Sequence, residues 1–320
     1  MIDFFENIYN KIENRSKFLS QVKYYACLRF IIRNVVNIIA PLYFLLTHGK
    51  KEYLIRNNKT INNKSPKVII TLTSFPGRIN RVWLVIETIL RQSQKPDRII
   101  LWLSKEQFTS INQLPIRLIS QTNKGLEIRF VDGDLKSHKK YYYTLKEFPD
   151  DIIITIDDDI LYPSWMIEDL ITASIKNPQS VVCRYACVIS YIKDEIIPYD
   201  KWVKPISDNT IHADLFFGSG GGTLFPAYSL SHEILNEYVI KNVTPLADDV
   251  LLNAICRLNN IDVIKVAGNS KLLPVIFNKK THLSTINIGQ LQNDHQIKML
   301  REYSTSKFNI DPFKKKIFSK

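Results

Sequence analysis

Three consecutive aspartates, Asp157, Asp158 and Asp159, directly follow an apolar run at residues 152–156. The run reads Ile-Ile-Ile-Thr-Ile, which is typical of a buried strand. A buried carboxylate is costly unless it is paired or bound to a cation, so three at a strand end need strong electrostatic partners. The sequence therefore predicts a cation-binding site where this strand ends.

A divalent cation suits this acidic run best, because hard ions such as Mg²⁺ and Mn²⁺ prefer oxygen ligands. In an extended segment Asp157 and Asp159 point to the same side, since successive side chains alternate. Such an arrangement leaves coordination positions open for substrate phosphates. The alternative is a solvated acidic turn that caps the next helix, which Pro163 and Ser164 would begin.

The whole chain is basic and long enough for one large domain. It has 320 residues, 45% of them hydrophobic, and a formal net charge of +12. This charge favours an anionic partner, but the sequence has no zinc-finger spacing, RNA-binding aromatic motif or long basic block. We therefore expect a phosphorylated substrate or an acidic lipid surface, and no nucleic acid.

Residues 1–60 form a segment in which basic and apolar positions follow helical spacing. Arg29, Arg33 and Asn37 recur every four residues, and large aliphatic residues fill most of the surface between them. The apolar stretch at residues 35–46 is shorter than the ~20 residues that cross a bilayer. We predict an interfacial helix on anionic headgroups, peripheral at the cytoplasmic inner face of the cell membrane. The alternative is an ordinary helix pair packed on the domain.

The segment before the aspartates alternates strands with helices. Three apolar runs precede the aspartate strand, at residues 67–73, 98–103 and 127–131. Two helical patterns lie between the strands, at residues 79–90 and 139–148. This alternation predicts an α/β fold with a doubly wound, mostly parallel sheet, in which ligands bind at the carboxyl ends of the strands.

The later part of the chain is less regular. A glycine-rich strand is predicted at residues 216–224, and helices are predicted at residues 228–239 and 249–259. We expect the α/β domain to cover residues 67–305 and a basic tail to follow at residues 306–320.

Four stretches of the chain match one known family in order. Residues 71–78 read Thr-Leu-Thr-Ser-Phe-Pro-Gly-Arg, the aspartates at 157–159 form an Asp-x-Asp motif, glycines gather at 218–222, and residues 247–249 read Ala-Asp-Asp. Together they resemble the metal-dependent glycosyltransferase A (GT-A) fold, in particular the family 2-like bacterial sugar transferases of capsule and lipopolysaccharide synthesis. The similarity covers about residues 67–300.

The resemblance implies a transferase that moves a sugar from a nucleotide-sugar donor, with UDP as the expected nucleotide, to a glycan or polyprenyl-linked acceptor. It implies Mn²⁺ or Mg²⁺ on Asp157 and Asp159, with His282 or His295 as the candidate further ligand. It also makes Asp249 the general base of an inverting reaction. Asp248 is then free to cap the following helix or to orient an acceptor hydroxyl.

Other residues are expected to contact the donor. Lys139, Lys140 or Arg78 would add positive charge beside the diphosphate. The glycine loop would let the backbone approach a sugar without interference from Cβ atoms. The donor-binding set that we predict is Thr71, Thr73, Arg78, Asp132, Lys140, Asp157 and Asp158, with Gly220, Gly221 and Gly222 in the glycine loop.

One departure from the family lies in the nucleotide half. Many relatives end their second strand with an aspartate that contacts uracil, whereas this chain has Ser104 there. The base contact is therefore left to Asp132, Thr73 or the backbone.

Two other functions share parts of the pattern. A phosphatase of the Asp-x-Asp type has Thr or Val where this chain has Leu161, and its nucleophile normally ends the first strand. An inactive membrane-bound sugar-binding protein would have no need of acids at every expected position. We therefore expect an enzyme of the hexosyltransferase class.

Overall fold

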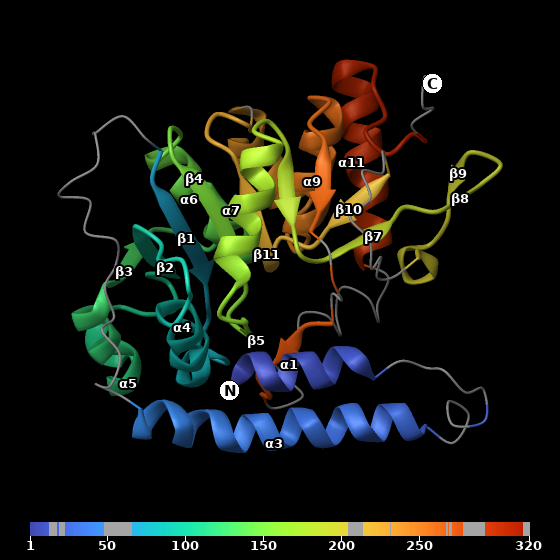
Figure 1. Cartoon of the computed structure of the whole chain (residues 1–320). Helices are drawn as coiled ribbons and strands as arrows, with labels where there is room; N and C mark the ends of the chain where they lie inside the picture. Colours follow the sequence, from blue (N-terminus) through green and yellow to red (C-terminus); the bar gives the residue numbers. More distant parts are fainter. Residues whose placement is uncertain are drawn as a thin grey trace.

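A seven-stranded sheet forms the centre of the protein in this computed structural model, with helices on both of its faces (Figure 1). Its strand order is β12-β6-β11-β4-β1-β2-β3. The strands are β1 (Val68–Thr73), β2 (Arg98–Ser104), β3 (Leu126–Val131), β4 (Ile152–Ile156), β6 (Val181–Cys183), β11 (Gly221–Phe225) and β12 (Val263–Lys265). The structure describes residues 1–12, 18, 23–47, 66–203, 214–230, 232–266, 268, 271–277 and 292–315.

The sheet is mostly parallel, as predicted. Among the described strands of this sheet only β11 runs antiparallel to its neighbours, which are β4 and β6. β1 lies between β2 and β4, with Ile70 opposite Ile99 and Ile154. The carboxyl ends of β1, β2, β3 and β4 therefore meet at one edge of the sheet.

The strands are buried on both faces. In β1, Ile70 and Leu72 belong to the core that contains α4 (Val82–Leu90) and α7 (Met166–Lys176). Ile69 belongs to the opposite core, which contains α6 (Lys139–Glu147), α9 (Asp248–Leu258) and α11 (Gln292–Phe308). Two-sided burial explains why these strands read as continuous apolar runs.

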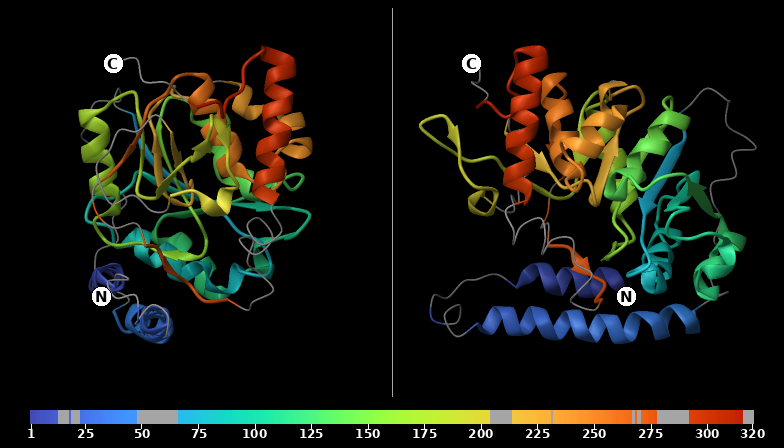
Figure 2. Two further views of the ribbon diagram at one scale, coloured as in Figure 1. Left: turned by 90° about the vertical axis from the view of Figure 1, so that its right-hand side faces the viewer. Right: turned by 180° about the vertical axis from the view of Figure 1, so that it is seen from behind.

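The two N-terminal helices pack on the domain. Helices α1 (Ile2–Lys11) and α3 (Tyr24–Leu46) lie side by side along one edge of the molecule (Figure 2). Val36, Ala40 and Phe44 of α3 are buried in the same core as α4, and so are Ile2 and Tyr9 of α1. One face of each helix is thus part of the domain interior.

Two predictions for the later chain were wrong. The strand expected at 216–224 is two strands, β10 (Leu215–Phe217) and β11, because the glycines form the turn between them. β10 pairs with β7 (Ala186–Val188) in a separate small sheet. The helix expected at 228–239 is replaced by a short 3₁₀ turn, η6 (His232–Leu235), followed by α8 (Glu237–Asn242). Asn236 begins α8, since its side chain accepts the first free backbone N–H groups.

The described part of the expected basic tail is packed on the domain. Helix α11 continues to Phe308, beyond the expected boundary at residue 305. Phe313 is fully buried, and Arg257 donates hydrogen bonds to the carbonyl oxygens of Pro312 and Lys314.

Candidate active site

A pocket of about 500 Å³ opens where the parallel strands end. Strands β1, β2, β3 and β4 each contribute to the pocket wall, either through their last residues or through the loop that follows. The start of α9 closes another side. The polar lining includes Thr73, Ser74, Arg78, Gln107, Asp134, Ser137, Lys139, Lys140, Asp157, Asp158, Asp159, Asp248 and Asp249. This is the edge at which the doubly wound fold predicted a ligand.

Two aspartates of the triplet at residues 157–159 face the pocket, and one points inward. The side chains of Asp157 and Asp159 are 40% and 22% exposed, whereas that of Asp158 is 7% exposed. Asp158 accepts hydrogen bonds from Ser74 Oγ at 2.6 Å and Arg78 Nη1 at 2.7 Å. The triplet thus has the alternation expected of an Asp-x-Asp motif, with the two outer carboxylates available to a ligand.

Arg78 forms ion pairs with two carboxylates of the triplet. Its Nη1 lies 2.7 Å from Asp158 Oδ1 and 2.8 Å from Asp159 Oδ2. Burial disfavours the charged guanidinium, but Asp158 and Asp159 outweigh it and raise the pKa of Arg78. Arg78 was predicted beside the donor diphosphate, and the structure shows it neutralising the carboxylates of the triplet.

Lys140 joins the two acidic segments of the pocket. Its Nζ lies 2.7 Å from Asp157 Oδ1 and 2.8 Å from Asp248 Oδ2. Burial opposes the ammonium charge, yet Asp157, Asp248 and Asp249 raise the pKa of Lys140. The lysine therefore stays charged, and it links the triplet to the start of α9.

Asp248 and Asp249 are neighbours in the chain with opposite pKa shifts. Ser219 donates to both, from Oγ to Asp248 Oδ2 and from its backbone N–H to Asp249 Oδ1, each at 2.7 Å. Although burial favours a protonated acid, the charge of Lys140 lowers the pKa of Asp248. Burial and the charge of Asp248 raise the pKa of Asp249 to about 7. Asp248 thus stays ionised, whereas Asp249 exchanges a proton near neutral pH.

Asp248 does not cap helix α9. The N-cap residue is Ala247, and Asp248 is the first residue of the helix. Its carboxylate is directed to Lys140 and Ser219 instead. Of the two roles left open for Asp248, the geometry excludes capping, and the orientation of an acceptor hydroxyl stays a prediction.

The imidazole ring of His138 is buried and neutral. Its Nε2 lies 2.6 Å from the carbonyl oxygen of Thr244, which only accepts, so Nε2 carries the proton. Its Nδ1 then accepts the Tyr141 hydroxyl at 2.7 Å. Burial lowers the pKa of His138, in agreement with this tautomer.

The glycine loop at residues 218–222 allows close packing against the acids. A Cβ atom at Gly220 would lie 1.8 Å from Asp157 Oδ2, and one at Gly221 would lie 2.7 Å from Tyr185 Cβ. Gly222 has a φ of +94°, which favours glycine. These contacts explain the glycines through their packing, so a sugar facing the loop stays a prediction.

Two buried polar atoms of the pocket wall lack partners in the part of the chain that the structure describes. Gln107 Oε1 and Ser137 Oγ are buried, and neither has a hydrogen-bond partner among the described residues. The other amide atom of Gln107 donates to Asp134 Oδ2 at 2.8 Å, which fixes the side chain in place. Buried polar atoms are normally satisfied, so two orphans in one pocket wall indicate a ligand.

Two further residues predicted to contact the donor also line the pocket. Lys139 is buried and pairs with Asp134, and burial lowers its pKa. Thr73 lines the pocket where β1 ends, and its hydroxyl donates to the carbonyl oxygen of Trp102 at 2.8 Å.

Two predicted donor contacts lie outside the pocket lining. Thr71 is fully buried, and its hydroxyl donates to the carbonyl oxygen of Lys140, which holds β1 against α6. Asp132 is exposed to solvent and pairs with Lys105 at 3.0 Å. The turn after β3 brings Asp134 into the lining instead.

The predicted histidine ligands do not add to the described site. His282 lies outside the described residues, and His295 is exposed on α11. Among the residues that the structure describes, no group of three His, Cys, Asp or Glu side chains is arranged around one point. A cation here would rest on Asp157 and Asp159, whose oxygen atoms suit Mg²⁺ or Mn²⁺ with the remaining ligands from phosphate and water.

Besides Gln107, Asp134 and Ser137, sequence reasoning missed four side chains that form hydrogen bonds at this site. Ser74 directly follows β1 and Ser219 lies within the glycine loop, so their positions could have marked them. Tyr162 accepts the backbone N–H of Asp157 at 2.9 Å through its hydroxyl. Tyr162 and His138 carry no such signal, because each also bonds a carbonyl oxygen from a distant part of the chain, that of Gly220 and that of Thr244.

No protein-family model and no curated protein matches the sequence. Solved structures with a similar fold include the mannosyltransferase PcManGT from Pyrobaculum calidifontis in complex with GDP-Man and Mn²⁺. That match has 13% identity and a TM-score of 0.47, and it covers 89% of this chain and 77% of that chain.

Two further solved structures are similar. One is 4-diphosphocytidyl-2C-methyl-D-erythritol synthase from Anaerococcus prevotii, with 17% identity, a TM-score of 0.42, and coverage of 71% of this chain and 96% of that chain. The other is CMP:2-keto-3-deoxy-manno-octonic acid synthetase complexed with CTP, with 12% identity, a TM-score of 0.39, and coverage of 72% and 99%. Identities and TM-scores this low do not decide which reaction this chain catalyses.

Proposed function

We propose that the protein is a metal-dependent, inverting glycosyltransferase that uses a nucleotide sugar, with UDP-sugars as the first candidates. Its acceptor would be a glycan or polyprenyl-linked molecule of bacterial surface polysaccharide synthesis. The observation that carries this proposal is the meeting of two acidic segments, residues 157–159 and the pair Asp248 and Asp249, in one pocket. Lys140 bridges them, and Gln107 and Ser137 extend the pocket with free polar atoms.

The charge of the acidic end supports a metal ion. Five carboxylates line it, and two buried cations, Arg78 and Lys140, contact them. Burial is the main cause that raises the pKa of Asp159 to about 7, and Asp157 and Asp158 add to it. Such a site repels a diphosphate unless a divalent cation joins them. When bound, Mn²⁺ or Mg²⁺ neutralises the charge of the leaving diphosphate.

The pair at the start of α9 supports proton transfer. Asp249 has a pKa near the pH of the cytoplasm, so its carboxylate form can take the proton of an acceptor hydroxyl. Ser219 fixes this carboxylate through its backbone N–H. Asp248 remains ionised and is suited to orient the acceptor, because Lys140 and the Ser219 hydroxyl hold it in place.

Gln107 and Ser137 replace Asp132 in our assignment of the nucleotide contacts. The amide oxygen of Gln107 is an acceptor, which suits an amino or imino group of a base. The hydroxyl of Ser137 suits a ribose hydroxyl. Both atoms are unpartnered among the described residues, whereas Asp132 faces solvent.

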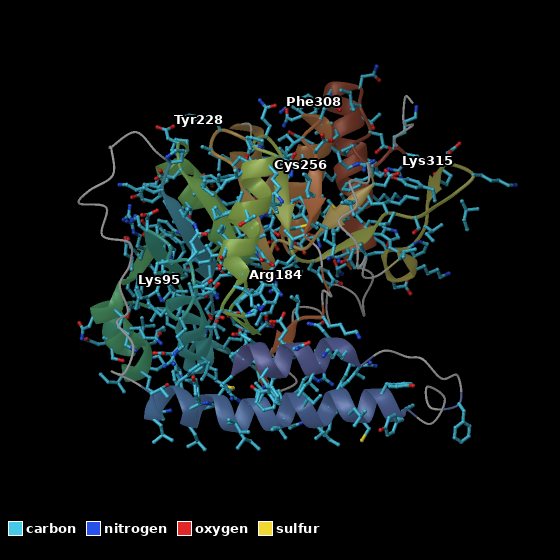
Figure 3. All side chains as sticks on the ribbon, viewed as in Figure 1. Lys95, Arg184, Tyr228, Cys256, Phe308 and Lys315 are labelled. Carbon is cyan, nitrogen blue, oxygen red and sulfur yellow. The ribbon has the colours of Figure 1, made fainter. Side chains whose placement is uncertain are left out.

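We also propose that the protein lies on the inner face of the cell membrane through the outer face of α3. Helix α3 is the described helix that is long and apolar enough to cross a membrane, judged by length and composition. Its inner face packs in the core, so we place it flat on the bilayer. Side chains of the outer face point away from the domain (Figure 3). The exposed apolar residues are Tyr24, Phe30, Ile31, Val35, Ile38, Ile39, Leu42, Leu45 and Leu46.

The basic stripe of α3 is placed differently from our prediction. Arg29 and Arg33 share a helix face with Asn37, which contacts the domain, so they do not form the outer surface. Membrane binding would therefore depend on apolar insertion more than on attraction to anionic headgroups.

A panel of nucleotide sugars tests the proposed reaction. The purified protein is incubated with each donor in Mn²⁺, in Mg²⁺ or in a chelator, and release of the nucleoside diphosphate is measured. We expect release from one donor that stops in the chelator. Failure of every donor would reject a glycosyltransferase. Phosphate release from p-nitrophenyl phosphate would favour the phosphatase alternative.

A further inference from the structure

A short strand supports the aspartate triplet from one side. β13 (Leu273–Pro274) pairs antiparallel with β5 (Ile160–Leu161), which directly follows Asp159. The backbone N–H of Val275 donates to the carbonyl oxygen of Asp159 at 2.7 Å. The backbone position of the last aspartate in the triplet is thus set by residues 273–275.

Residues 273–277 also contact Arg78, the side chain that neutralises the triplet. The ring of Phe277 faces the guanidinium of Arg78, with 5.5 Å from Cζ to the ring centroid. Arg78 in turn contacts Asp158 and Asp159. A shift of residues 273–277 would therefore move both the backbone of the triplet and the side chain that neutralises it.

Helix α3 holds the opposite edge of this segment through one buried amide. Asn37 Nδ2 donates to the carbonyl oxygen of Pro274 at 2.9 Å, and Asn37 Oδ1 accepts the backbone N–H of Ile276 at 2.8 Å. The side chain thus replaces a neighbouring strand at this edge. Arg81 adds bonds to the carbonyl oxygens of Ile276 at 2.9 Å and Asn37 at 3.1 Å.

Helix α1 forms hydrogen bonds with the residues just before β13 and just after β5. Asn10 Oδ1 accepts the backbone N–H of Lys271, just before β13, at 3.1 Å. The carboxylate of Asp3 accepts the backbone N–H of Ser164 at 2.7 Å and its hydroxyl at 2.6 Å, just after β5. Helices α1 and α3 are therefore both hydrogen-bonded to residues in or next to the strand pair β5 and β13, which supports the triplet.

We propose that Asn37 is a positioning residue for the metal- and donor-binding carboxylates. It acts through residues 274–276, so the helix that we place on the membrane is also part of the support of the active site. This inference rests on the proposed function, because it takes a divalent cation and a diphosphate as the ligands of the triplet. Deletion of residues 1–60 would then disturb the active site and not only remove a membrane anchor.

Asn37→Ala and Ile38→Ala form a matched pair of variants. Ile38 is the next residue of α3, but its side chain is 67% exposed on the outer face. Mn²⁺ affinity is measured on the protein alone, from the electron paramagnetic resonance signal of free Mn²⁺. We expect Asn37→Ala to weaken Mn²⁺ binding about tenfold, the scale of a lost buried hydrogen-bond pair. Ile38→Ala is expected to leave Mn²⁺ binding unchanged and to weaken liposome binding.

Kinetics separate positioning from general loss of stability. Positioning predicts that Asn37→Ala raises the donor KM while kcat at saturating donor and metal stays nearly unchanged. Simple destabilisation would lower the folded fraction, so kcat would fall while KM and the Mn²⁺ affinity stayed constant. That second pattern, or wild-type values for both, would overturn the inference.

Hydrogen exchange separates this inference from the proposed function. If the wild-type protein binds no Mn²⁺, the metal assignment fails, and the backbone amides of residues 157–161 then decide the positioning role. Faster exchange of these amides in Asn37→Ala, but not in Ile38→Ala, supports it. Equal exchange in the two variants refutes it.

Discussion

The aspartate triplet at residues 157–159 and the pair Asp248 and Asp249 face one pocket but differ in support. Each segment has one buried carboxylate, Asp158 or Asp248, and the other acids are partly exposed. The triplet is held by Arg78 and a neighbouring strand, and the pair by Ser219 and Lys140. The two outer carboxylates of the triplet suit the binding of a cation, and the divided acidities of Asp248 and Asp249 suit proton transfer.

The largest expected effect separates the two members of the pair. Asp249→Asn removes the proposed general base, so kcat should fall about 10²- to 10⁴-fold while donor affinity stays nearly constant. Asp248→Asn is the matched control and should mainly raise the KM of the acceptor. Steady-state kinetics with both variants checks this. Near wild-type turnover in Asp249→Asn, or a product that retains the anomeric configuration, would remove Asp249 from its role.

The second prediction concerns the lysine that links the two segments. Lys140→Met leaves the buried carboxylate of Asp248 and the partly exposed carboxylate of Asp157 without their cation. Removal of one partner from a buried pair costs about 3–5 kcal/mol, so the free energy of unfolding should drop by this amount. Urea denaturation measures it, and Lys140→Met combined with Asp248→Asn should recover part of the loss. No recovery in the double variant would argue against the pairing.

The third prediction follows from the pKa of about 7 for Asp249. A general base acts when deprotonated, so kcat/KM should rise about tenfold per pH unit below pH 7 and level off above it. The charge of Asp248 helps to raise this pKa. Asp248→Asn should therefore move the midpoint to lower pH, whatever its effect on the maximal rate. A profile that falls with rising pH through 7 would contradict the assignment.

The smallest expected effects compare two serines, Ser74 and Ser219, whose hydroxyl groups each donate to one carboxylate. Ser74→Ala removes the bond to Asp158 and should weaken Mn²⁺ binding about tenfold. Ser219→Ala removes the hydroxyl bond to Asp248 but keeps the backbone bond to Asp249. It should raise the acceptor KM and leave Mn²⁺ affinity unchanged. Identical effects of the two variants would show that the segments do not have separate roles.

The sequence predicted the features that local patterns determine. Apolar runs bounded by turns place β1, β2, β3 and β4 correctly, and the acids after β4 and at the start of α9 follow from the same pattern. The parallel sheet then brings these acids to one edge, because its strands share a direction. This is why the triplet and Asp249 could be predicted to share one pocket, whereas their roles in metal binding and proton transfer stay predictions.

Contacts between distant segments account for what the sequence did not predict. Thr71 and Thr73 share one face of β1, but only Thr73, the last residue of the strand, reaches the pocket, whereas Thr71 packs against α6. Asp132 and Asp134 are two residues apart in one turn, and only the turn geometry decides which of them lines the site. Asn37 meets Ile276 across 239 positions of sequence, which no local pattern reveals.

Binding of nucleoside diphosphates with and without metal tests the central claim most directly. UDP, GDP and CDP are titrated calorimetrically into the wild-type protein and into Asp159→Ala, first with Mn²⁺ and then with a chelator. Loss of one acid relieves repulsion in the triplet, so the variant should stay folded. We expect one nucleotide to bind the wild-type protein in Mn²⁺, and this binding to disappear in the chelator and in Asp159→Ala. Equal binding in all these conditions would contradict a metal-dependent donor site on the triplet.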